Sequence, residues 1–202
     1  MLVLASASPR RQELLRNAGI PFTVFATNIP EEPQSGESGR DCAERLAREK
    51  ARAALHQRPG KLVLAADTVV IVNGEILGKP RDDADAARML HLLSGKTHQV
   101  TTGVCLAGPL RTGNEKLKTE FEDTRSETTL VTMTALSDED IRSYIRSGEP
   151  MDKAGAYAIQ GTASRWIPRI EGDYFNVVGL PVALVFGMLK SAVFGFDPGT
   201  GN

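Results

Sequence analysis

The 202-residue sequence has few of the residue types that form disulfides, metal centres and catalytic triads. It contains two cysteines, Cys42 and Cys105, and three histidines, and none of these is spaced as metal ligands are. Both cysteines fall in apolar patterns, which favours reduced core residues of a cytoplasmic protein. No Ser-His-Asp arrangement, histidine cluster or activated cysteine is recognisable. These absences argue against catalysis by a covalent nucleophile.

The chain also lacks an excess of either charge and any long apolar run. Its 24 Lys and Arg residues nearly balance 25 Asp and Glu residues, for a formal net charge of −1. This balance argues against a nucleic-acid partner, because proteins that coat nucleic acid carry a large positive excess. No stretch reaches the length of a membrane span, and the apolar start at residues 2–5 is too short for a signal peptide. We therefore expect no membrane association.

The length of the chain suits one α/β domain that buries an ordinary core. We expect residues 1–193 to form this domain and residues 194–202 to form a flexible tail. No internal repeat or long linker marks a second domain. The oligomeric state stays open, with a homodimer as one candidate.

The start of the chain predicts a strand that leads into a helix. Residues 2–5 are apolar, which is typical of a buried strand. Ser8 and Pro9 suit an N-cap and a first helical residue, and Gly19 suits the end of the helix.

Arg10 and Arg11 occupy the first turn of this predicted helix, where the backbone dipole is already positive and acidic residues are preferred. The two guanidinium groups, the free helix N–H groups and the hydroxyls of Ser6 and Ser8 form a candidate phosphate cradle. The alternative is that both arginines point into water.

A carboxylate interrupts the strongest strand pattern, at residues 61–72. Asp67 lies between two apolar runs, and Asn73-Gly74 after them suits a hairpin turn. A buried carboxylate must be hydrogen-bonded, paired with a cation or bound to a metal. Because α/β proteins bind ligands where buried strands give way to loops, we interpret Asp67 as a functional residue.

Three other charged positions are ambiguous by themselves. Lys50 starts beside the apolar face of a helix predicted over residues 41–57, and it either extends into water or points into a site. Glu31 and Glu32, in a polar segment, are either solvated or functional. Residues 149–161, rich in charge and glycine, form either a binding loop or an ordinary connection.

Elsewhere the pattern alternates between strands and helices. We expect a hairpin over residues 164–178, because two strand-like runs flank Glu171-Gly172-Asp173. Further strands are predicted at 21–25, 75–77, 99–107 and 128–135, and further helices at 82–93, 137–147 and 181–193.

Cations outnumber carboxylates at these loop edges. The cations are Arg10, Arg11, Lys50, Lys79 and Lys153, and the carboxylates are Asp67 and Glu31 or Glu32. This balance suits a polyphosphate held by Arg and Lys, and a divalent metal held by carboxylates. Positioning and charge neutralisation would then carry the reaction.

Five motifs follow one another along the chain: residues 4–11, Ala66-Asp67-Thr68-Val69-Val70, Leu77-Gly78-Lys79-Pro80, Leu93-Ser94-Gly95 and residues 147–161. Together they resemble the Maf family, whose members are nucleoside triphosphate pyrophosphatases first associated with inhibition of septum formation. The resemblance runs from Met1 to about Val193. Residues 149–155 and Gln160-Gly161 are similar to the branch that hydrolyses dTTP and UTP, rather than the branch that acts on 7-methyl-GTP.

The resemblance implies a role for each matching position. Asp67 matches the proton acceptor and a metal ligand. Glu32 corresponds best to a second metal ligand, but Glu31 stays an alternative because the local sequence departs from the family's pattern. The metal would be Mg²⁺, Mn²⁺ or Co²⁺. Arg10, Thr68 and Gln160 match positions associated with the choice of base. The residues expected around the phosphates are Ser6, Ser8, Arg11, Lys50 and Lys79.

The resemblance also implies a fold and a reaction. The fold is a mixed, twisted sheet flanked by helices, like that of inosine triphosphate pyrophosphatases, with two lobes around a cleft. The reaction is metal-assisted attack of water on dTTP, UTP or modified pyrimidine analogues, releasing pyrophosphate. The alternatives are a pyrophosphatase for another base, such as 7-methyl-GTP, and a non-catalytic nucleotide-binding regulator of cell division.

Overall fold

A computed structural model describes residues 1–109 and 120–194. The predicted flexible tail, residues 194–202, therefore lies outside the described part except for its first residue. None of the described helices is both long and apolar enough to cross a membrane.

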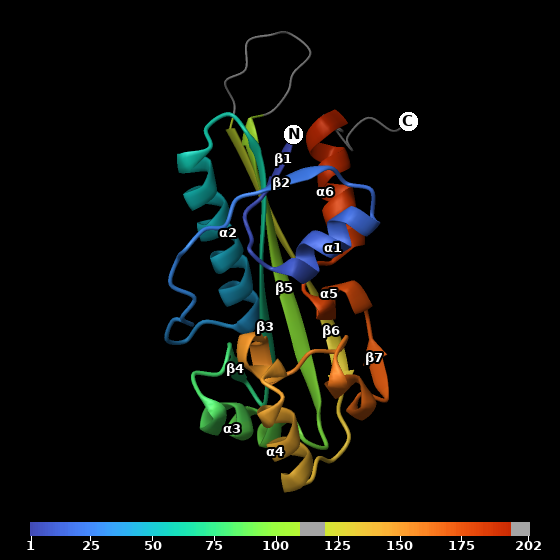
Figure 1. The fold of residues 1–202 in the computed structure, drawn as a ribbon. Helices are drawn as coiled ribbons and strands as arrows, with labels where there is room; N and C mark the ends of the chain where they lie inside the picture. The colour runs from blue at the N-terminus through green and yellow to red at the C-terminus, as the bar shows by residue number, and fades with distance from the viewer. Residues whose placement is uncertain (110–119, 195–202) are drawn as a thin grey trace, which may run out of the picture.

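The described residues form a seven-stranded mixed sheet in the order β2-β1-β3-β5-β6-β7, with β4 beside β3. Three long antiparallel strands run along the molecule (Figure 1): β3 (Leu62–Val72), β5 (Thr97–Pro109) and β6 (Glu120–Thr132). The short strands join their edges. These are β1 (Leu2–Leu4), β2 (Phe22–Val24), β4 (Glu75–Leu77) and β7 (Arg169–Glu171).

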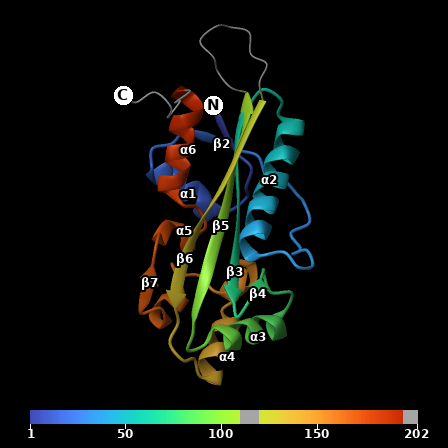
Figure 2. The ribbon, with the colours of Figure 1, turned by 180° about the vertical axis from the view of Figure 1, so that it is seen from behind.

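Helices cover both faces of one half of this sheet (Figures 1 and 2). The helix α2 (Gly39–Gln57) lies on one face, and α1 (Pro9–Asn17) and α6 (Val182–Phe194) lie on the other. This arrangement explains why the first half of β3 is apolar on both sides: Val63 and Ala65 pack toward α2, while Leu64 and Ala66 pack toward α1 and α6. We call this half the α2 lobe.

The other half, which we call the α3 lobe, has a core of its own around Leu90, Tyr144 and Trp166. It contains α3 (Asp83–Leu93), α4 (Asp138–Arg146) and three 3₁₀ turns, η1 (Glu149–Asp152), η2 (Ala154–Ala156) and η3 (Thr162–Trp166). A short helix, α5 (Tyr174–Val178), lies between the lobes, and its Val178 and Val177 contact different cores. The predicted fold class, a twisted mixed sheet flanked by helices in two lobes, is confirmed.

Two predictions of local structure are corrected. The hairpin predicted over residues 164–178 is wrong, because only β7 in this range is a strand. The Asp173 side chain accepts a hydrogen bond from the Phe175 N–H at 2.7 Å and so starts helix α5 where a second strand was expected. The strand β6 begins at Glu120 rather than Thr128, because every residue of β6 from Glu120 to Thr132 pairs with a residue of β5.

Candidate active site

A gap in the edge of the sheet creates the site. The strand β1 pairs with β3 as far as Leu64, and β4 pairs with β3 from Val70 onward. Among the described residues, no strand pairs with this edge of β3 between those two points. Side chains alternate along a strand, so Asp67 and Thr68 point to opposite faces, and both reach the gap.

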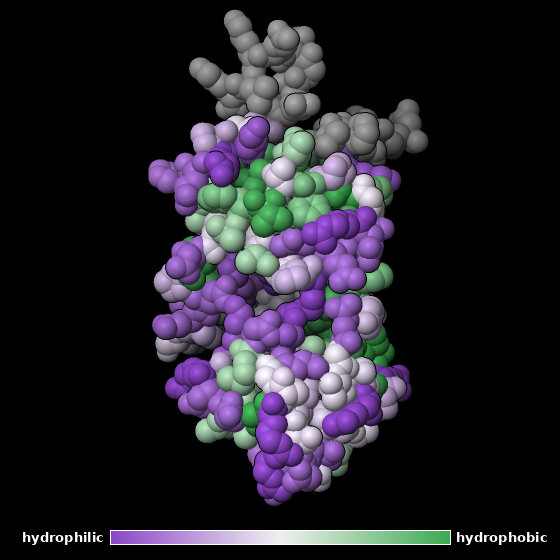
Figure 3. All heavy atoms as spheres, viewed as in Figure 1, coloured by the Kyte–Doolittle hydropathy of each residue, from purple (hydrophilic) through white to green (hydrophobic). Residues whose placement is uncertain are grey.

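A cleft of about 900 Å³ lies over this gap. Hydrophilic side chains gather across the middle of the face shown in Figure 3, where the surface is hollowed. All residues that the sequence analysis assigned to a site line this cleft: Ser6, Ser8, Arg10, Arg11, Glu31, Glu32, Lys50, Asp67, Thr68, Lys79, Lys153 and Gln160.

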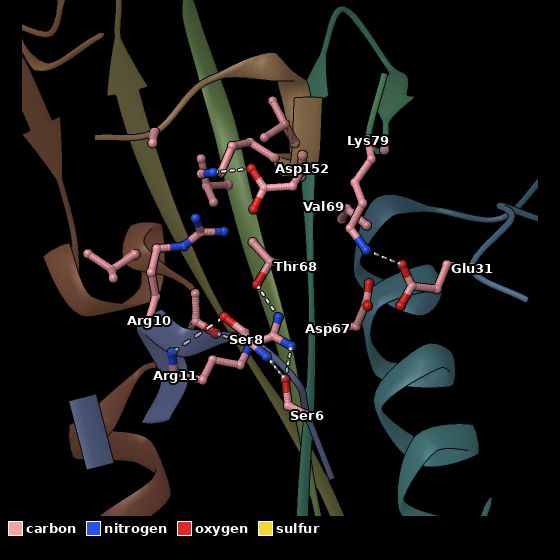
Figure 4. Close-up of a pocket in the computed structure, with 18 of the residues that line it drawn as sticks. Ser6, Ser8, Arg10, Arg11, Glu31, Asp67, Thr68, Val69, Lys79 and Asp152 are labelled. Carbon is pink, nitrogen blue, oxygen red and sulfur yellow. Dashed lines mark hydrogen bonds and ion pairs between the residues drawn. The ribbon is translucent and has the colours of Figure 1, made fainter. Parts of the chain in front are cut away.

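Two lysines and two carboxylates form a continuous ionic chain in the cleft. Lys50 is only 6% exposed, and its ammonium lies 2.6 Å from Asp67 Oδ1 and 2.6 Å from Glu31 Oε1. The Lys79 ammonium lies 2.8 Å from Glu31 Oε2 (Figure 4). Asp67 is therefore paired with a cation, one of the three states expected for a buried carboxylate. Of the two orientations open to Lys50, the structure has the one that points into the site.

The structure distinguishes between the adjacent glutamates. Burial by itself raises the pKa of Glu31, but the hydrogen bonds from Lys50 and Lys79 outweigh it and lower that pKa to about 2. Glu32 lines the cleft without an ion pair among the described residues, and its backbone oxygen accepts a hydrogen bond from Arg45. Glu31, not Glu32, is thus the carboxylate that converges with Asp67.

The two arginines of α1 have different environments. Ser8 and Pro9 start the helix as predicted, with the Ser8 side chain accepting the Arg11 N–H. Arg10 extends into the cleft toward Asp152 (Figure 4). Arg11 turns inward, where burial lowers its pKa while the nearby carboxylates of Asp67 and Glu31 raise it.

Arg11 joins distant segments of the chain. Its Nε donates to Gly179 O at 2.8 Å, its Nη1 to Ala66 O at 2.7 Å and to Ser6 Oγ at 3.3 Å, and its Nη2 to Thr68 Oγ1 at 3.0 Å. The bond to Ala66 O satisfies a backbone carbonyl at the unpaired edge of β3. Most of the five N–H donors of this guanidinium therefore bind protein atoms, and few are left for a ligand.

A polar network beneath Thr68 was not predicted. Thr68 Oγ1 lies 2.9 Å from Thr102 Oγ1, which donates to Asn176 O at 3.1 Å. Both Thr102 and Asn176 are fully buried. The polar pair Thr101-Thr102 within an apolar strand was the sequence signal for this network, by the same reasoning that singled out Asp67.

The residues of the cleft fit a divalent metal. In the described part of the chain, no three or more His, Cys, Asp or Glu side chains are grouped so that they could hold a metal ion by themselves. Asp67 and Glu31 nevertheless lie close together, because one oxygen of each carboxylate is 2.6 Å from the Lys50 ammonium. Mg²⁺ in nucleotide-binding sites commonly takes one or two carboxylates and completes its shell with phosphates and water, so two carboxylates suffice.

Comparison with known proteins gives weak structural and strong sequence relationships. Among solved structures, the Staphylococcus aureus Ham1 protein has a TM-score of 0.48 at 14% identity, covering 94% of this chain and 98% of that chain. A HAM1 protein from Coxiella burnetii has a TM-score of 0.38 at 21% identity, covering 65% of this chain and 72% of that one.

The sequence relatives are much closer. A dTTP/UTP pyrophosphatase of Koribacter versatilis (strain Ellin345) is 54% identical over 191 residues, which cover 95% of this chain and 94% of that protein. A dTTP/UTP pyrophosphatase of Symbiobacterium thermophilum is 50% identical over 201 residues, covering 100% of this chain and 97% of that protein. The family model described as Maf-like protein matches residues 1–192, and the chain therefore belongs to the Maf-like family.

Proposed function

We propose that the protein hydrolyses dTTP and UTP to the nucleoside monophosphate and pyrophosphate. The observation that carries the proposal is the buried Asp67 carboxylate at the unpaired edge of β3, paired with Lys50 in a cleft rich in cations. The names of relatives that are 54% and 50% identical support this choice of substrates. We propose the cytoplasm as its location.

The triphosphate binds to the cations and hydroxyls that line the cleft. Lys79 supplies positive charge near its mouth, and the Ser6 and Ser8 hydroxyls lie at the start of α1. Helix N-termini favour anions, so these hydroxyls are suited to phosphate oxygens. Arg11 contributes chiefly by holding the edge of β3 in place, because its donors already bind Ala66, Thr68 and Gly179.

The base is recognised at the other side of the cleft. Gln160 is exposed to the cleft and carries one amide donor group and one acceptor, which suits the ring edge of uracil or thymine. Arg10 and Thr68 complete this recognition. Modified pyrimidines that keep the same edge belong to the same substrate class.

Water attacks the α-phosphorus, and Asp67 accepts its proton. Asp67 and Glu31 would hold a divalent cation, Mg²⁺, Mn²⁺ or Co²⁺, which when bound neutralises phosphate charge and makes water a better nucleophile. Lys50 lies between the two carboxylates and keeps them oriented toward one point. Pyrophosphate leaves toward Lys79, whose ammonium balances the charge of the leaving group.

The decisive experiment is a substrate panel with the purified protein. It comprises dTTP, UTP, a modified pyrimidine triphosphate, CTP, ATP, GTP and 7-methyl-GTP, each with Mg²⁺, Mn²⁺ or Co²⁺, with chromatographic detection of the monophosphate and a pyrophosphate assay. We expect turnover of dTTP and UTP. Preference for 7-methyl-GTP would assign another base, and no turnover of any nucleotide would favour a non-catalytic binding protein.

We predict that Asp67→Asn keeps the fold and lowers kcat for dTTP about 10²- to 10⁴-fold, the range typical of a lost general base. The amide retains the shape of the side chain but cannot accept the proton. The matched control is Asp138→Asn, at an exposed position on α4 outside the cleft. A near wild-type kcat for Asp67→Asn at saturating metal would show that another group accepts the proton.

A further inference from the structure

Glu149 lies outside the cleft but at the start of the segment that carries Gln160. Its partly buried carboxylate accepts hydrogen bonds from Tyr144, which precedes η2, and from Thr162, which follows the turn after η2. Oε1 accepts the Thr162 N–H at 3.0 Å, and Oε2 accepts the Thr162 hydroxyl at 3.0 Å. Oε1 also accepts the Tyr144 hydroxyl at 2.8 Å.

Tyr144 extends this contact to a second point of the segment. Its hydroxyl oxygen accepts the Ala158 N–H at 3.2 Å. The ring is fixed in the core of the α3 lobe, only 1% exposed and packed edge-on against Trp166. Through Tyr144, the Glu149 carboxylate therefore holds the backbone at Ala158 as well as at Thr162.

Gln160 lies midway between these two anchored residues. The Gly161 N–H donates to Ala158 O at 3.1 Å, which closes a tight turn with Gln160 in its third position. A Cβ atom at Gly161 would fall 2.0 Å from Glu149 Oε1. Glycine at this position is therefore what allows the carboxylate to lie directly against the turn.

We propose that Glu149 and Tyr144 are positioning residues that fix Gln160 for discrimination between nucleobases. This inference rests on the proposed function, in which Gln160 contacts the base. A glutamine amide has both a donor and an acceptor, so a mobile Gln160 could pair with uracil or cytosine by turning over. Discrimination requires that its backbone present the amide to the ring edge in one position, within a few tenths of an ångström.

The chemistry of the anchor matches this role. An ionised carboxylate only accepts hydrogen bonds, and the Thr162 N–H and the hydroxyls of Thr162 and Tyr144 each donate one to Glu149. Burial by itself raises the pKa of Glu149, but the hydrogen bonds from Thr162 and Tyr144 outweigh it, so that this pKa lies below its usual value. The Thr162 N–H lies 3.0 Å from Oε1 and 3.2 Å from Oε2, so glutamine in either orientation would place its NH₂ group close to a group that can only donate.

The test compares Glu149→Gln, Tyr144→Phe and Gln160→Ala with the control Glu139→Gln, an exposed glutamate of α4. The readouts are kcat and KM for UTP and CTP. We expect Gln160→Ala and both positioning variants to raise KM for UTP and to lower the ratio of kcat/KM for UTP over CTP about tenfold. Their kcat should change by less than about threefold. Tripolyphosphate, used as a competitive inhibitor that lacks a base, should keep its inhibition constant.

A double variant separates positioning from general destabilisation. In the Gln160→Ala background, Glu149→Gln should have no further effect on the UTP/CTP ratio. The same loss in that background, an unchanged ratio in both single variants, or a parallel change in tripolyphosphate inhibition would overturn the inference. If Glu149→Gln does not fold, Tyr144→Phe decides, because it removes the hydroxyl and keeps the core ring. An inactive wild-type protein would refute the proposed function itself.

Discussion

His98 is a buried histidine that the proposed chemistry does not use. Its side chain is 2% exposed, and Nε2 lies 2.7 Å from the Tyr157 hydroxyl, with the two rings edge to face. Nδ1 has no hydrogen-bond partner in the described part of the chain. Burial lowers the pKa of His98 to about 4, so the imidazole is neutral at pH 7. Charging this ring inside the core destabilises the folded state.

We predict that His98 makes folding stability pH-dependent in mildly acidic solution. Between the ordinary histidine pKa of 6.5 and the folded value of about 4, the unfolded chain binds a proton that the folded chain does not, so stability falls as pH falls. Between pH 7 and pH 5 this contribution amounts to about 2 kcal/mol. Urea denaturation at both pH values should show His98→Gln to be less pH-sensitive than the wild type. An equal reduction in the control His91→Gln, on the surface, would contradict the assignment.

The helix α2 carries Lys50, so the distance between α2 and the sheet sets the position of this cation. Four buried alanines, at positions 43, 47, 51 and 54, let the helix approach closely. Gly103 on β5 completes the contact, because a Cβ atom there would fall 2.3 Å from the backbone carbonyl of Ala43. Small side chains on both elements thus bring Lys50 within reach of Asp67.

We predict that Gly103→Ala destabilises the protein by about 1–3 kcal/mol, since the added methyl group meets helix backbone that cannot turn away. The displaced helix should also lower kcat by moving Lys50. The control is Gly187→Ala in α6, where a Cβ atom has open space and alanine favours the helix by about 0.5–1 kcal/mol. Urea denaturation and kcat measure both effects. Wild-type stability of Gly103→Ala would mean that α2 does not pack this closely on β5.

The two lobes share the long strands, so neither lobe has an independent sheet. On β5, Val104 and Leu106 belong to the core of the α2 lobe, while Val100 belongs to that of the α3 lobe. On β3, Leu64 belongs to the core of the α2 lobe and Val70 to that of the α3 lobe. Loss of either core removes the packing that holds these strands, and the cleft between the lobes depends on both.

We predict a single unfolding transition for the protein. Trp166, the one tryptophan of the sequence, reports on the α3 lobe, and far-ultraviolet circular dichroism reports on the whole chain, so the two curves should coincide. Leu15→Ala in the α2 lobe and Leu93→Ala in the α3 lobe should each lower the free energy of unfolding by about 2–5 kcal/mol and shift both curves together. A Trp166 curve that stays in place for Leu15→Ala would show that the lobes unfold separately.

Local patterns of residues were enough to predict most of the helices and the chemical character of the site. The helix predicted over residues 41–57 is observed as Gly39–Gln57, and that predicted over 82–93 as Asp83–Leu93. Caps and apolar periodicity act between residues a few positions apart, so a local pattern suffices to predict them. Asp67 was identifiable for a related reason, because a carboxylate inside an apolar strand requires a partner wherever the chain places it.

The partner of each charged group could not be predicted, because it depends on how distant parts of the chain pack together. In the folded protein Lys50 points inward, and Glu31 rather than Glu32 lies beside Asp67. Arg11 donates to Gly179 O, 168 positions further along the chain. Asp173 is the N-cap of helix α5, where a hairpin strand was predicted. Hydrogen bonds and ion pairs depend on separations of about 3 Å between groups that the chain itself does not hold together. Such separations arise when helices dock on the sheet, and no local pattern of residues encodes them.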